Sequence, residues 1–207
     1  MTGATLFSED FESDLSLWTG LGGGSHNGAI VADPLRAGNH VLTFTAIVIG
    51  GDIFNALPFS LQAGHTYRLD FEYLGYALPN SVPGNFGAFI GITEDLPGKH
   101  QWIYGTRPLN AGGIVTPDAL IDDGVWRTYS WVFQPPVLPQ FFGPGAFMPH
   151  HLMLEDTSLS GGVPGDSLFD NIRISAVPEP SFALPLAAAL VVLLTRRRKG
   201  RYFNLLR

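Results

Sequence analysis

The chain has 207 residues, of which 45% are hydrophobic and only 14% are charged, so a disordered polar polymer is excluded. Its 25 glycines and 16 prolines favour short strands joined by turns, and the lack of cysteine excludes disulfides. Residues 1–177 carry 17 acidic and six basic side chains, whereas residues 178–207 carry one acidic and six basic side chains. An acidic body without a basic stripe argues against nucleic-acid binding.

Alternation of apolar and polar residues predicts a series of strands. In chain order the segments are 4–8, 41–49, 66–73, 86–93, 125–133, 152–154 and 168–175. Two of them gather apolar residues on one face: Tyr67, Leu69, Phe71 and Tyr73 in one, and Tyr129, Trp131 and Phe133 in the other. Six or more strands without a convincing amphipathic helix predict one all-β domain over residues 1–175, folded as an antiparallel β-sandwich.

The C-terminal region contains an apolar run. Residues 182–194 are apolar throughout, and 180–195 carry no charge. Sixteen helical residues span ~24 Å, short of the ~30 Å hydrocarbon core, so length alone favours a buried helix. Four cations follow the run directly: Arg196, Arg197, Arg198 and Lys199. These cations favour a single transmembrane helix over about 181–195, with the C-terminus in the cytoplasm and the body outside.

A proline-flanked acid precedes this run, as Pro178, Glu179 and Pro180. The order of motif, apolar helix and basic stop resembles the PEP-CTERM sorting signal of exported bacterial proteins. The resemblance covers 176–201 and leaves a cytoplasmic extension over 202–207. It implies anchoring in the inner membrane with the body in the periplasm. It also implies processing by exosortase, a membrane cysteine protease, and then a cell-surface or extracellular location.

The N-terminus bears on export as well. An exported protein needs a signal peptide, yet the first seven residues have neither a basic n-region nor an apolar h-region. We therefore expect an in-frame signal peptide upstream of Met1.

The order of the predicted strands resembles a jelly-roll carbohydrate-binding module of the galactose-binding-like type. Five pieces carry the resemblance: 7–12 with Trp18, 36–44, 61–71, 124–133 and 168–174. The resemblance implies polysaccharide as a ligand and a structural calcium ion where the first and last strands meet. The matching ligands are Glu12 and Asp170, with Asp10 as a further candidate and a backbone carbonyl near 39–40.

Asp170 needs a partner in any case. Alternation over 168–175 groups it with Leu168, Ile172 and Ile174 on an otherwise apolar face, where an unpaired carboxylate is costly. Calcium, which takes six to eight oxygen ligands, is one partner. Backbone amides or Arg173 at the strand end are the alternative.

A sugar site needs exposed aromatic rings and hydrogen-bonding side chains near them. Four residues in or near predicted loops are candidates for such a site: Trp102, Tyr104, Tyr76 and Asn85. The other three tryptophans, at positions 18, 126 and 131, are expected in the core. His150 and His151 are adjacent and point to opposite faces of a strand, so they do not form a metal pair.

Enzymatic activity is not expected. Four pairs of adjacent acids occur, at 9–10, 94–95, 122–123 and 155–156, but sequence neighbours on a strand diverge, whereas glycosidase carboxyls face each other across a cleft. Three functions stay open: a polysaccharide-binding surface or matrix protein, a non-binding structural or adhesive module with the same sorting signal, and a polysaccharide-acting hydrolase or lyase.

Overall fold

The computed structural model describes residues 3–20, 23–45, 53–62, 64–76, 88–96, 99–106, 114–115, 120–135, 149–156 and 164–178. Side chains are described at these positions except 94–96, 99–102, 114–115, 149 and 156. The chain divides into two units, Met1–Val177 and Pro178–Arg207, and all described residues except Pro178 belong to the first.

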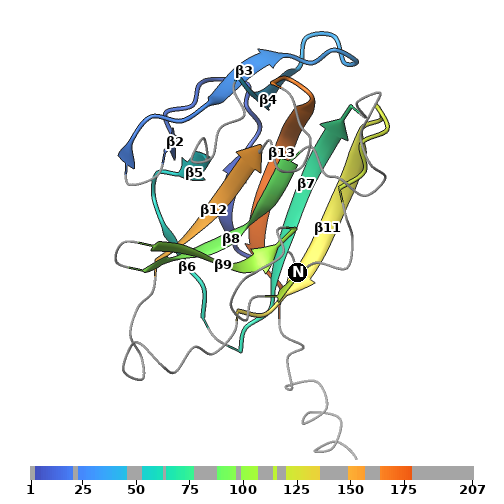
Figure 1. The fold of residues 1–207 in the computed structure, drawn as a ribbon. Coiled ribbons are helices and arrows are strands. Elements are labelled where there is room, and N and C mark those ends of the chain that lie inside the picture. Colours follow the sequence, from blue (N-terminus) through green and yellow to red (C-terminus); the bar gives the residue numbers. More distant parts are fainter. Residues whose placement is uncertain are drawn as a thin grey trace, which may run out of the picture. The chain divides into compact units, whose positions relative to one another are not determined.

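The described residues form strands and no α-helix (Figure 1). The strands are β1 (Thr5–Glu9), β2 (Trp18–Thr19), β3 (Gly28–Ala32), β4 (His40–Phe44), β5 (Ile53–Asn55), β6 (Phe59–Ser60), β7 (Tyr67–Gly75), β8 (Ala88–Leu96), β9 (Lys99–Gly105), β10 (Ile114–Val115), β11 (Arg127–Phe133), β12 (Pro149–Asp156) and β13 (Ser167–Ala176).

These strands pair into two sheets. The first has the order β11-β7-β13-β4-β3, with β1 paired to β13. The second has the order β10-β9-β8-β12-β5-β2, with β6 paired to β12. The pairs between described strands are antiparallel except β9 with β10, which is parallel. The predicted antiparallel, all-β architecture is therefore confirmed for the described part of the chain, with one short parallel exception.

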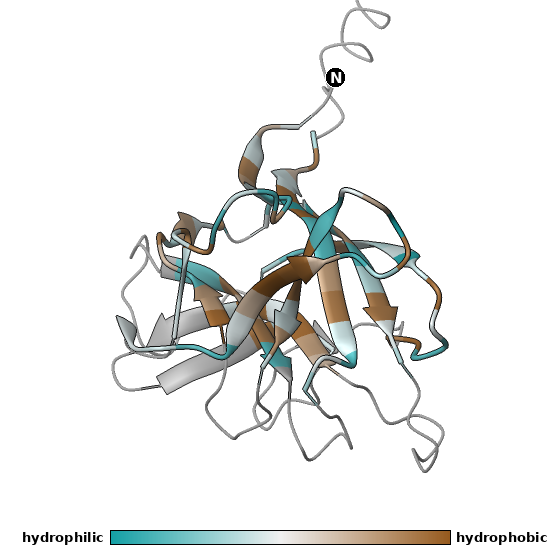
Figure 2. Ribbon diagram, turned by 90° about the horizontal axis from the view of Figure 1, so that it is seen from above, coloured by the Kyte–Doolittle hydropathy of each residue, from teal (hydrophilic) through white to brown (hydrophobic). Residues whose placement is uncertain are grey.

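The β7–β11 ladder lies at one edge of the first sheet, and Figure 1 shows it as two long neighbouring arrows. Phe71 pairs with Tyr129, and Leu69 pairs with Trp131, so the apolar residues of both strands lie on the same face. Figure 2 shows the resulting alternation as brown and pale bands along the strands. The structure thus confirms that side chains alternate along both segments and that the predicted apolar residues face the core.

Aromatic contacts fill the space between the sheets. Phe71 stacks on Tyr129 with ring centroids 5.1 Å apart and meets Trp131 edge to face at 4.8 Å. From the second sheet, Tyr104 stacks on Phe133 at 4.5 Å. Such pairs stabilise by ~0.5–1.5 kcal/mol beyond the burial of their area. These ring contacts of the core therefore come from the two predicted aromatic strands and from β9.

The last strand, β13, differs from the prediction at one point. Its register with β7 shifts between Asp170 and Arg173, and Asn171 adopts a positive φ of 50°. The irregularity inserts an extra residue, so the inward face changes along the strand: Phe169 and Ile172 both lie in the main core. Leu168 packs instead in a separate cluster on the outer face. The grouping of Leu168 with Ile172 and Ile174 is therefore wrong, because strict alternation does not continue through a bulge.

Most predicted strands appear with shifted ends. The segment predicted at 152–154 is longer, from Pro149 to Asp156, and the one at 41–49 is described as a strand from His40 to Phe44. Trp18 and Trp131 are buried as expected, whereas Trp126 is only half-buried.

The C-terminal predictions lie outside the described residues. This applies to Glu179 and Pro180, to the helix predicted over 181–195, to Arg196, Arg197, Arg198 and Lys199, and to 202–207. Within the described segments, no helix has the length and apolarity that a membrane crossing requires.

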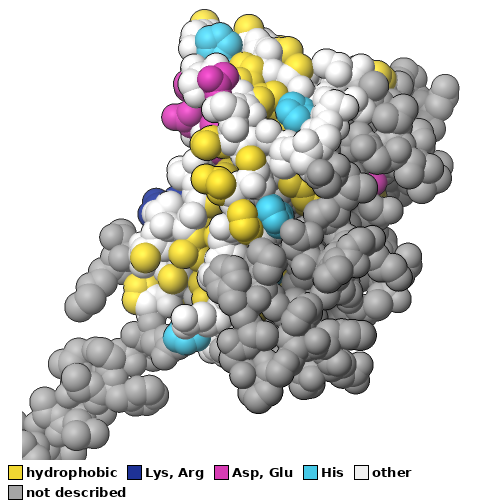
Figure 3. Space-filling model, turned by 90° about the vertical axis from the view of Figure 1, so that its left-hand side faces the viewer, with side chains coloured by type: hydrophobic (Ala, Val, Ile, Leu, Met, Phe, Trp, Pro, Cys, Tyr) yellow, Lys and Arg dark blue, Asp and Glu magenta, His cyan; other side chains and the backbone are white. Residues whose placement is uncertain are grey.

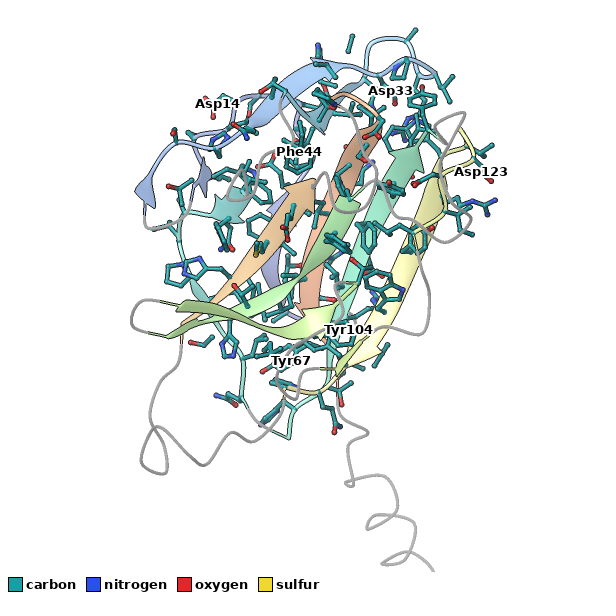
Figure 4. All side chains as sticks on the ribbon, viewed as in Figure 1. Asp14, Asp33, Phe44, Tyr67, Tyr104 and Asp123 are labelled. Carbon is teal, nitrogen blue, oxygen red and sulfur yellow. The ribbon has the colours of Figure 1, made fainter. Side chains whose placement is uncertain are left out.

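The body has two distinct ends. Ser167 pairs with Gly75 where β13 begins, and Ala176 pairs with Tyr67 where β13 ends. The Ala176 amide also donates to the Ala4 carbonyl, so both termini of the body lie at the second end. Figure 4 labels Asp33 and Asp123 at the first end and Tyr67 and Tyr104 at the other. We call the first the loop end and the second the exit end.

Candidate functional site

Polar side chains cover the outer face of the β7–β11 ladder. Since Leu69 and Phe71 point into the core, their neighbours on β7 and the partners of these neighbours on β11 point outward. We call this set the outer ladder: Arg68, Asp70 and Glu72 of β7, with Val132, Ser130 and Thr128 of β11 opposite them. Asp70 accepts hydrogen bonds from Arg68 Nε at 2.8 Å and from Ser130 Oγ at 2.6 Å.

Two aromatic residues continue the outer ladder at the loop end. Trp126 directly precedes β11, and Tyr76 directly follows β7 and is 37% exposed. The turn between Asp123 and Val125 lies beside Tyr76, because the Gly124 amide donates to the Gly75 carbonyl at 2.8 Å. Gly124 itself has a φ of +74°, a conformation that glycine adopts without strain. From Arg68 to Tyr76 the strip extends over ~26 Å, at about 3.3 Å per residue.

Arg36 joins the outer ladder to the neighbouring loop. Its guanidinium donates to Asp33 Oδ2 at 2.5 Å, to Glu72 Oε2 at 2.6 Å and to Asp170 Oδ2 at 2.8 Å. The Arg36 Cζ atom also lies 4.1 Å from the ring centroid of Trp126, a cation–π distance. The guanidinium thus holds β3–β4, β7 and β13 together at one point.

The amide of Asn39 and the indole N–H of Trp126 complete this arrangement. Asn39 Nδ2 donates to Asp33 Oδ2 at 3.0 Å and to Asp170 Oδ2 at 2.9 Å, and Trp126 Nε1 donates to Asp33 Oδ1 at 3.2 Å. Together with the residues above they form what we call the Arg36 cluster: Asp33, Arg36, Asn39, Glu72, Trp126 and Asp170.

The loop between β3 and β4 supplies three members of the Arg36 cluster, which are Asp33, Arg36 and Asn39. Asp33 Oδ1 accepts the Leu35 and Arg36 amides at 2.8 and 3.1 Å, and the Asp33 amide donates to the Asn39 carbonyl at 2.9 Å. Gly38 takes the positive φ of +81° that this tight loop requires. Asp33 therefore fixes the loop with one oxygen and leaves the other for Arg36 and Asn39.

The two buried acids of the Arg36 cluster shift in opposite directions. Burial raises the pKa of Asp33, but hydrogen bonds from the Leu35 amide, Arg36 and Asn39 outweigh it and lower the pKa to about 2. Burial also raises the pKa of Asp170, and here the bonds from Asn39 and the Asn171 amide only partly offset it. The cluster holds three carboxylates against one guanidinium, so it carries two excess negative charges when all are ionised.

Glu72 is oriented toward solvent by two donors. Its Oε2 atom accepts Arg36 Nη1 and, at 2.9 Å, Asn171 Nδ2. Its Oε1 atom has no hydrogen bond within the described residues, and the side chain is 25% exposed. Glu72 therefore presents a fixed acceptor beside Trp126 on the outer face, which is a useful group for binding a hydroxyl-rich ligand.

The outer face of the second sheet is different. Phe54, Phe89 and Met153 form a cluster separate from the main core and are 2–8% exposed. Met153 pairs with Phe54, and His151 pairs with Thr93 on the same face two residues away. His151 is 8% exposed and contacts Phe54 edge to face. This face is buried where it is described.

Of the sugar-binding residues predicted from sequence, only Tyr76 is described on the surface. Tyr104 is 4% exposed in the core, so its predicted exposed position is wrong; the aromatic face of β11 opposite β9 covers it. Trp102 pairs with Thr93 in the β8–β9 ladder, but its side chain is outside the described set, and Asn85 lies outside the described residues.

The predicted calcium ligands bond to other groups. Glu12 is exposed and accepts the His40 amide and contacts His40 Nδ1, both at 3.0 Å, and Asp10 is also exposed. Asp170 bonds Arg36 and the Asn171 amide rather than Arg173. Among the described residues, no group of three or more His, Cys, Asp or Glu side chains is placed so that it could hold a metal ion in the present structure. The three predicted ligands do not fit one shared ion as they are arranged, and calcium binding itself stays a prediction.

Sequence reasoning missed Arg36, Glu72, Asn39 and Asp33 as members of one cluster. A single signal in the sequence pointed to them: the segment 33–39 combines Asp, Pro, Arg, Gly and Asn, which is typical of an ordered turn. Their convergence with Asp170, 134 positions away from Arg36, has no local signature.

Comparisons with known proteins bear on the fold. No family model matches the chain, and no curated protein matches it. Among solved structures it is similar to the CBM22-1–CBM22-2 tandem domain of Xyn10C from Paenibacillus barcinonensis, with 18% identity and a TM-score of 0.50 over 88% of this chain and 48% of that one. It is also similar to the CBM22-1–GH10 modules of xylanase 10B from Clostridium thermocellum complexed with xylohexaose, with 12% identity and a TM-score of 0.50 over 88% of this chain and 30% of that one.

A third structure is the CBM22-1 xylan-binding domain of Xyn10C, with 19% identity and a TM-score of 0.47 over 86% of this chain and 98% of that one. The chain spans about half of the tandem domain and under a third of the xylanase modules. At these identities the likeness concerns the fold alone. The body of this chain has the β-sandwich architecture of a carbohydrate-binding module, as the predicted strand order indicated.

Proposed function

We propose that this chain is an exported bacterial surface or matrix protein whose β-sandwich binds polysaccharide without catalysing its cleavage. The observation that carries the proposal is the fold that it shares, over 88% of its length, with the tandem domain of Xyn10C and with the modules of xylanase 10B. One of these structures holds xylohexaose, an extended sugar chain. The ligand class proposed here is therefore a polysaccharide rather than a small molecule.

Within the described residues, the outer ladder with Trp126 and Tyr76 suits such a ligand best. It is long and exposed: the Arg68 side chain is 46% exposed and Val132 is 59% exposed. It also places the carboxylates of Asp70 and Glu72 on β7 opposite the hydroxyls of Ser130 and Thr128 on β11, and both kinds of group can bond sugar hydroxyls. On the outer face of the second sheet, Phe54, Phe89 and Met153 are 2–8% exposed and offer far less surface to a polymer.

Little basic surface is available for a polyanionic partner. Figure 3, which views the molecule from the left-hand side of Figure 1, shows apolar, acidic and histidine side chains but few Lys or Arg on the described part of this one face. The body carries 17 acidic and six basic residues in all. This balance supports an uncharged sugar chain over a nucleic acid.

The binding proposal is tested by affinity electrophoresis and calorimetric titration of the full chain against xylan, β-glucan and alginate. Tyr76→Ala should weaken binding about tenfold, equivalent to about 1.4 kcal/mol, because an exposed ring is the group that stacks on a pyranose face. Leu57→Ala is the matched control, since Leu57 is 75% exposed and lies outside the outer ladder. If no polysaccharide binds the unmodified chain, the non-binding structural or adhesive module is the better description.

The sorting part of the proposal concerns the C-terminal segment. The Val177 amide donates to the Thr66 carbonyl at 2.8 Å, and the next residue, Pro178, is exposed. The sheet therefore ends directly before the Pro-Glu-Pro motif, which supports a role for this motif as a segment that a protease can reach. We propose that exosortase recognises it and that the following apolar run anchors the chain in the inner membrane.

Replacing Pro178, Glu179 and Pro180 together by alanine tests sorting. The apolar run and its basic stop are unchanged, so the variant should still enter the membrane of a host that carries the protease. It should accumulate there as a larger, unprocessed species on immunoblots. Normal processing of this variant would leave the motif as a simple linker and contradict the sorting proposal.

A further inference from the structure

In the Arg36 cluster, three carboxylates surround a positive charge as they would surround a bound metal ion, but the charge is the guanidinium of Arg36. Its guanidinium bonds one oxygen each of Asp33, Glu72 and Asp170, at 2.5–2.8 Å. The side chains of Asp33 and Asp170 are 0% and 1% exposed, so both acids are withdrawn from water. Two buried carboxylates this close together need a positive charge between them.

The three acids come from separate parts of the chain. Asp33 follows β3, Glu72 lies on β7 and Asp170 lies on β13, where the bulge turns it to the outer face. Asp170 pairs directly with Glu72 in the ladder between these two strands. Like charges opposite each other destabilise a sheet, and here the Arg36 guanidinium bridges them.

The oxygen chemistry around the guanidinium is that of a hard-cation site. Asn39 directs its amide at Asp33 and Asp170, and rotation of this amide would present its oxygen instead. Divalent calcium takes six to eight oxygens from carboxylates, amides and water. Without Arg36 the three ionised carboxylates would carry three negative charges, and one divalent ion would reduce this to a single negative charge.

We infer that the Arg36 guanidinium takes the place of a bound metal ion in this chain, so that the sandwich needs no calcium at this point, and that removal of the guanidinium leaves a site for a divalent cation. Asp170 still needs a positive partner, as the sequence predicted, and that partner is the side chain of Arg36 rather than a bound ion. The inference is independent of polysaccharide binding.

Arg36→Gln is the informative variant, because glutamine removes the charge, leaves space and adds one amide oxygen. The full chain is melted in chelator and in millimolar calcium. The melting temperature of the unmodified chain should be the same in both. Arg36→Gln should melt lower in chelator and recover by several degrees in calcium, and calorimetry should detect one calcium site in this variant only.

Two further variants keep the test decisive. Arg127→Gln removes an arginine that pairs with Asp123 on the surface, and it should gain nothing from calcium. Adding Asp170→Asn to Arg36→Gln should abolish the calcium response. If Arg36→Gln is unfolded in chelator, refolding on addition of calcium and reversal by chelator support the inference equally.

Two results would overturn it. A higher melting temperature of the unmodified chain in calcium would mean that a metal ion binds in the presence of Arg36. Failure of calcium and manganese to bind or stabilise Arg36→Gln, folded or unfolded, would mean that the three carboxylates do not form a cation site.

Discussion

Val132, on the outer face of the first sheet, is 59% exposed, whereas Phe54, on the outer face of the second, is 2% exposed. Both sheets bury their inner faces against the same aromatic core. Their outer faces differ in chemistry: the outer ladder is polar and displayed, and the Phe54–Phe89–Met153 face is apolar and buried. Substitutions of similar size should therefore have large effects on stability on one face and small effects on the other.

The largest difference is expected between Phe54→Ala and Val132→Ala. Removing a buried Phe ring leaves a cavity, so Phe54→Ala should lower the free energy of unfolding by about 3–5 kcal/mol. Val132→Ala, at an exposed position, should change it by less than about 0.5 kcal/mol. Denaturant unfolding of the full chain measures both, and similar small losses would mean that the second face is not packed.

On the outer face of the first sheet, most substitutions should change stability little, and the Arg36 cluster should be the exception. Arg36→Met leaves Asp33 and Asp170 without their cation and should cost about 2–3 kcal/mol of unfolding free energy. This is below the 3–5 kcal/mol of a wholly buried pair, because the Arg36 side chain is 34% exposed. Arg127→Met breaks only a surface pair with Asp123 and should change the free energy of unfolding little. Equal losses of unfolding free energy for the two variants would mean that the Arg36 cluster is no more stabilising than a surface ion pair.

The pH dependence of stability should distinguish Asp33 from Asp170, two of the three acids that Arg36 bonds. The pKa of Asp33 is lowered to about 2, so its ionised form stabilises the fold above about pH 4, and this stability is lost as pH falls toward 2. Over that range the loss amounts to about 2 kcal/mol. Asp33→Asn should therefore flatten the acid limb of the unfolding curve.

Asp170 should act with the opposite sign. Because its pKa is raised, the folded state holds its proton more tightly than the unfolded state does, so stability falls as pH rises through that pKa. Asp170→Asn should remove this decrease on the alkaline side of pH 4, with stability followed by denaturant titration at each pH. Parallel pH profiles for the two asparagine variants would contradict the assignment.

The smallest effect is expected at Ser130. Its hydroxyl donates to Asp70 at the surface, where water can replace it, so Ser130→Ala should change the free energy of unfolding by about 0.5 kcal/mol or less. The same variant should lower polysaccharide affinity if sugar hydroxyls bond along the outer ladder. A stability loss above 1.5 kcal/mol, measured by thermal melts, would mean that this face is structural, as the second one is.

Local pattern was sufficient for the parts of the fold that depend on neighbours in sequence. Tyr67, Leu69, Phe71 and the aromatic residues of β11 could be assigned to the inward face because side chains on a strand alternate strictly. The excess of acids in the body, the apolar run near the C-terminus and its basic stop are likewise properties of the sequence itself.

Only the tertiary structure decided where that alternation stops and which distant residues meet. The bulge at Asp170 moves this acid to the outer face, because one extra residue reverses the facing of everything before it. Tyr104 is buried because β9 crosses the aromatic face of β11, a pairing between sheets that no local pattern encodes. Arg36 and Asp170 are 134 positions apart, and their ion pair exists because β4, β13 and β7 are neighbours in one sheet. The inward-facing side chains of regular strands could therefore be assigned from the sequence alone. The Arg36 cluster could not, because it depends on strand order, which is set by long-range packing.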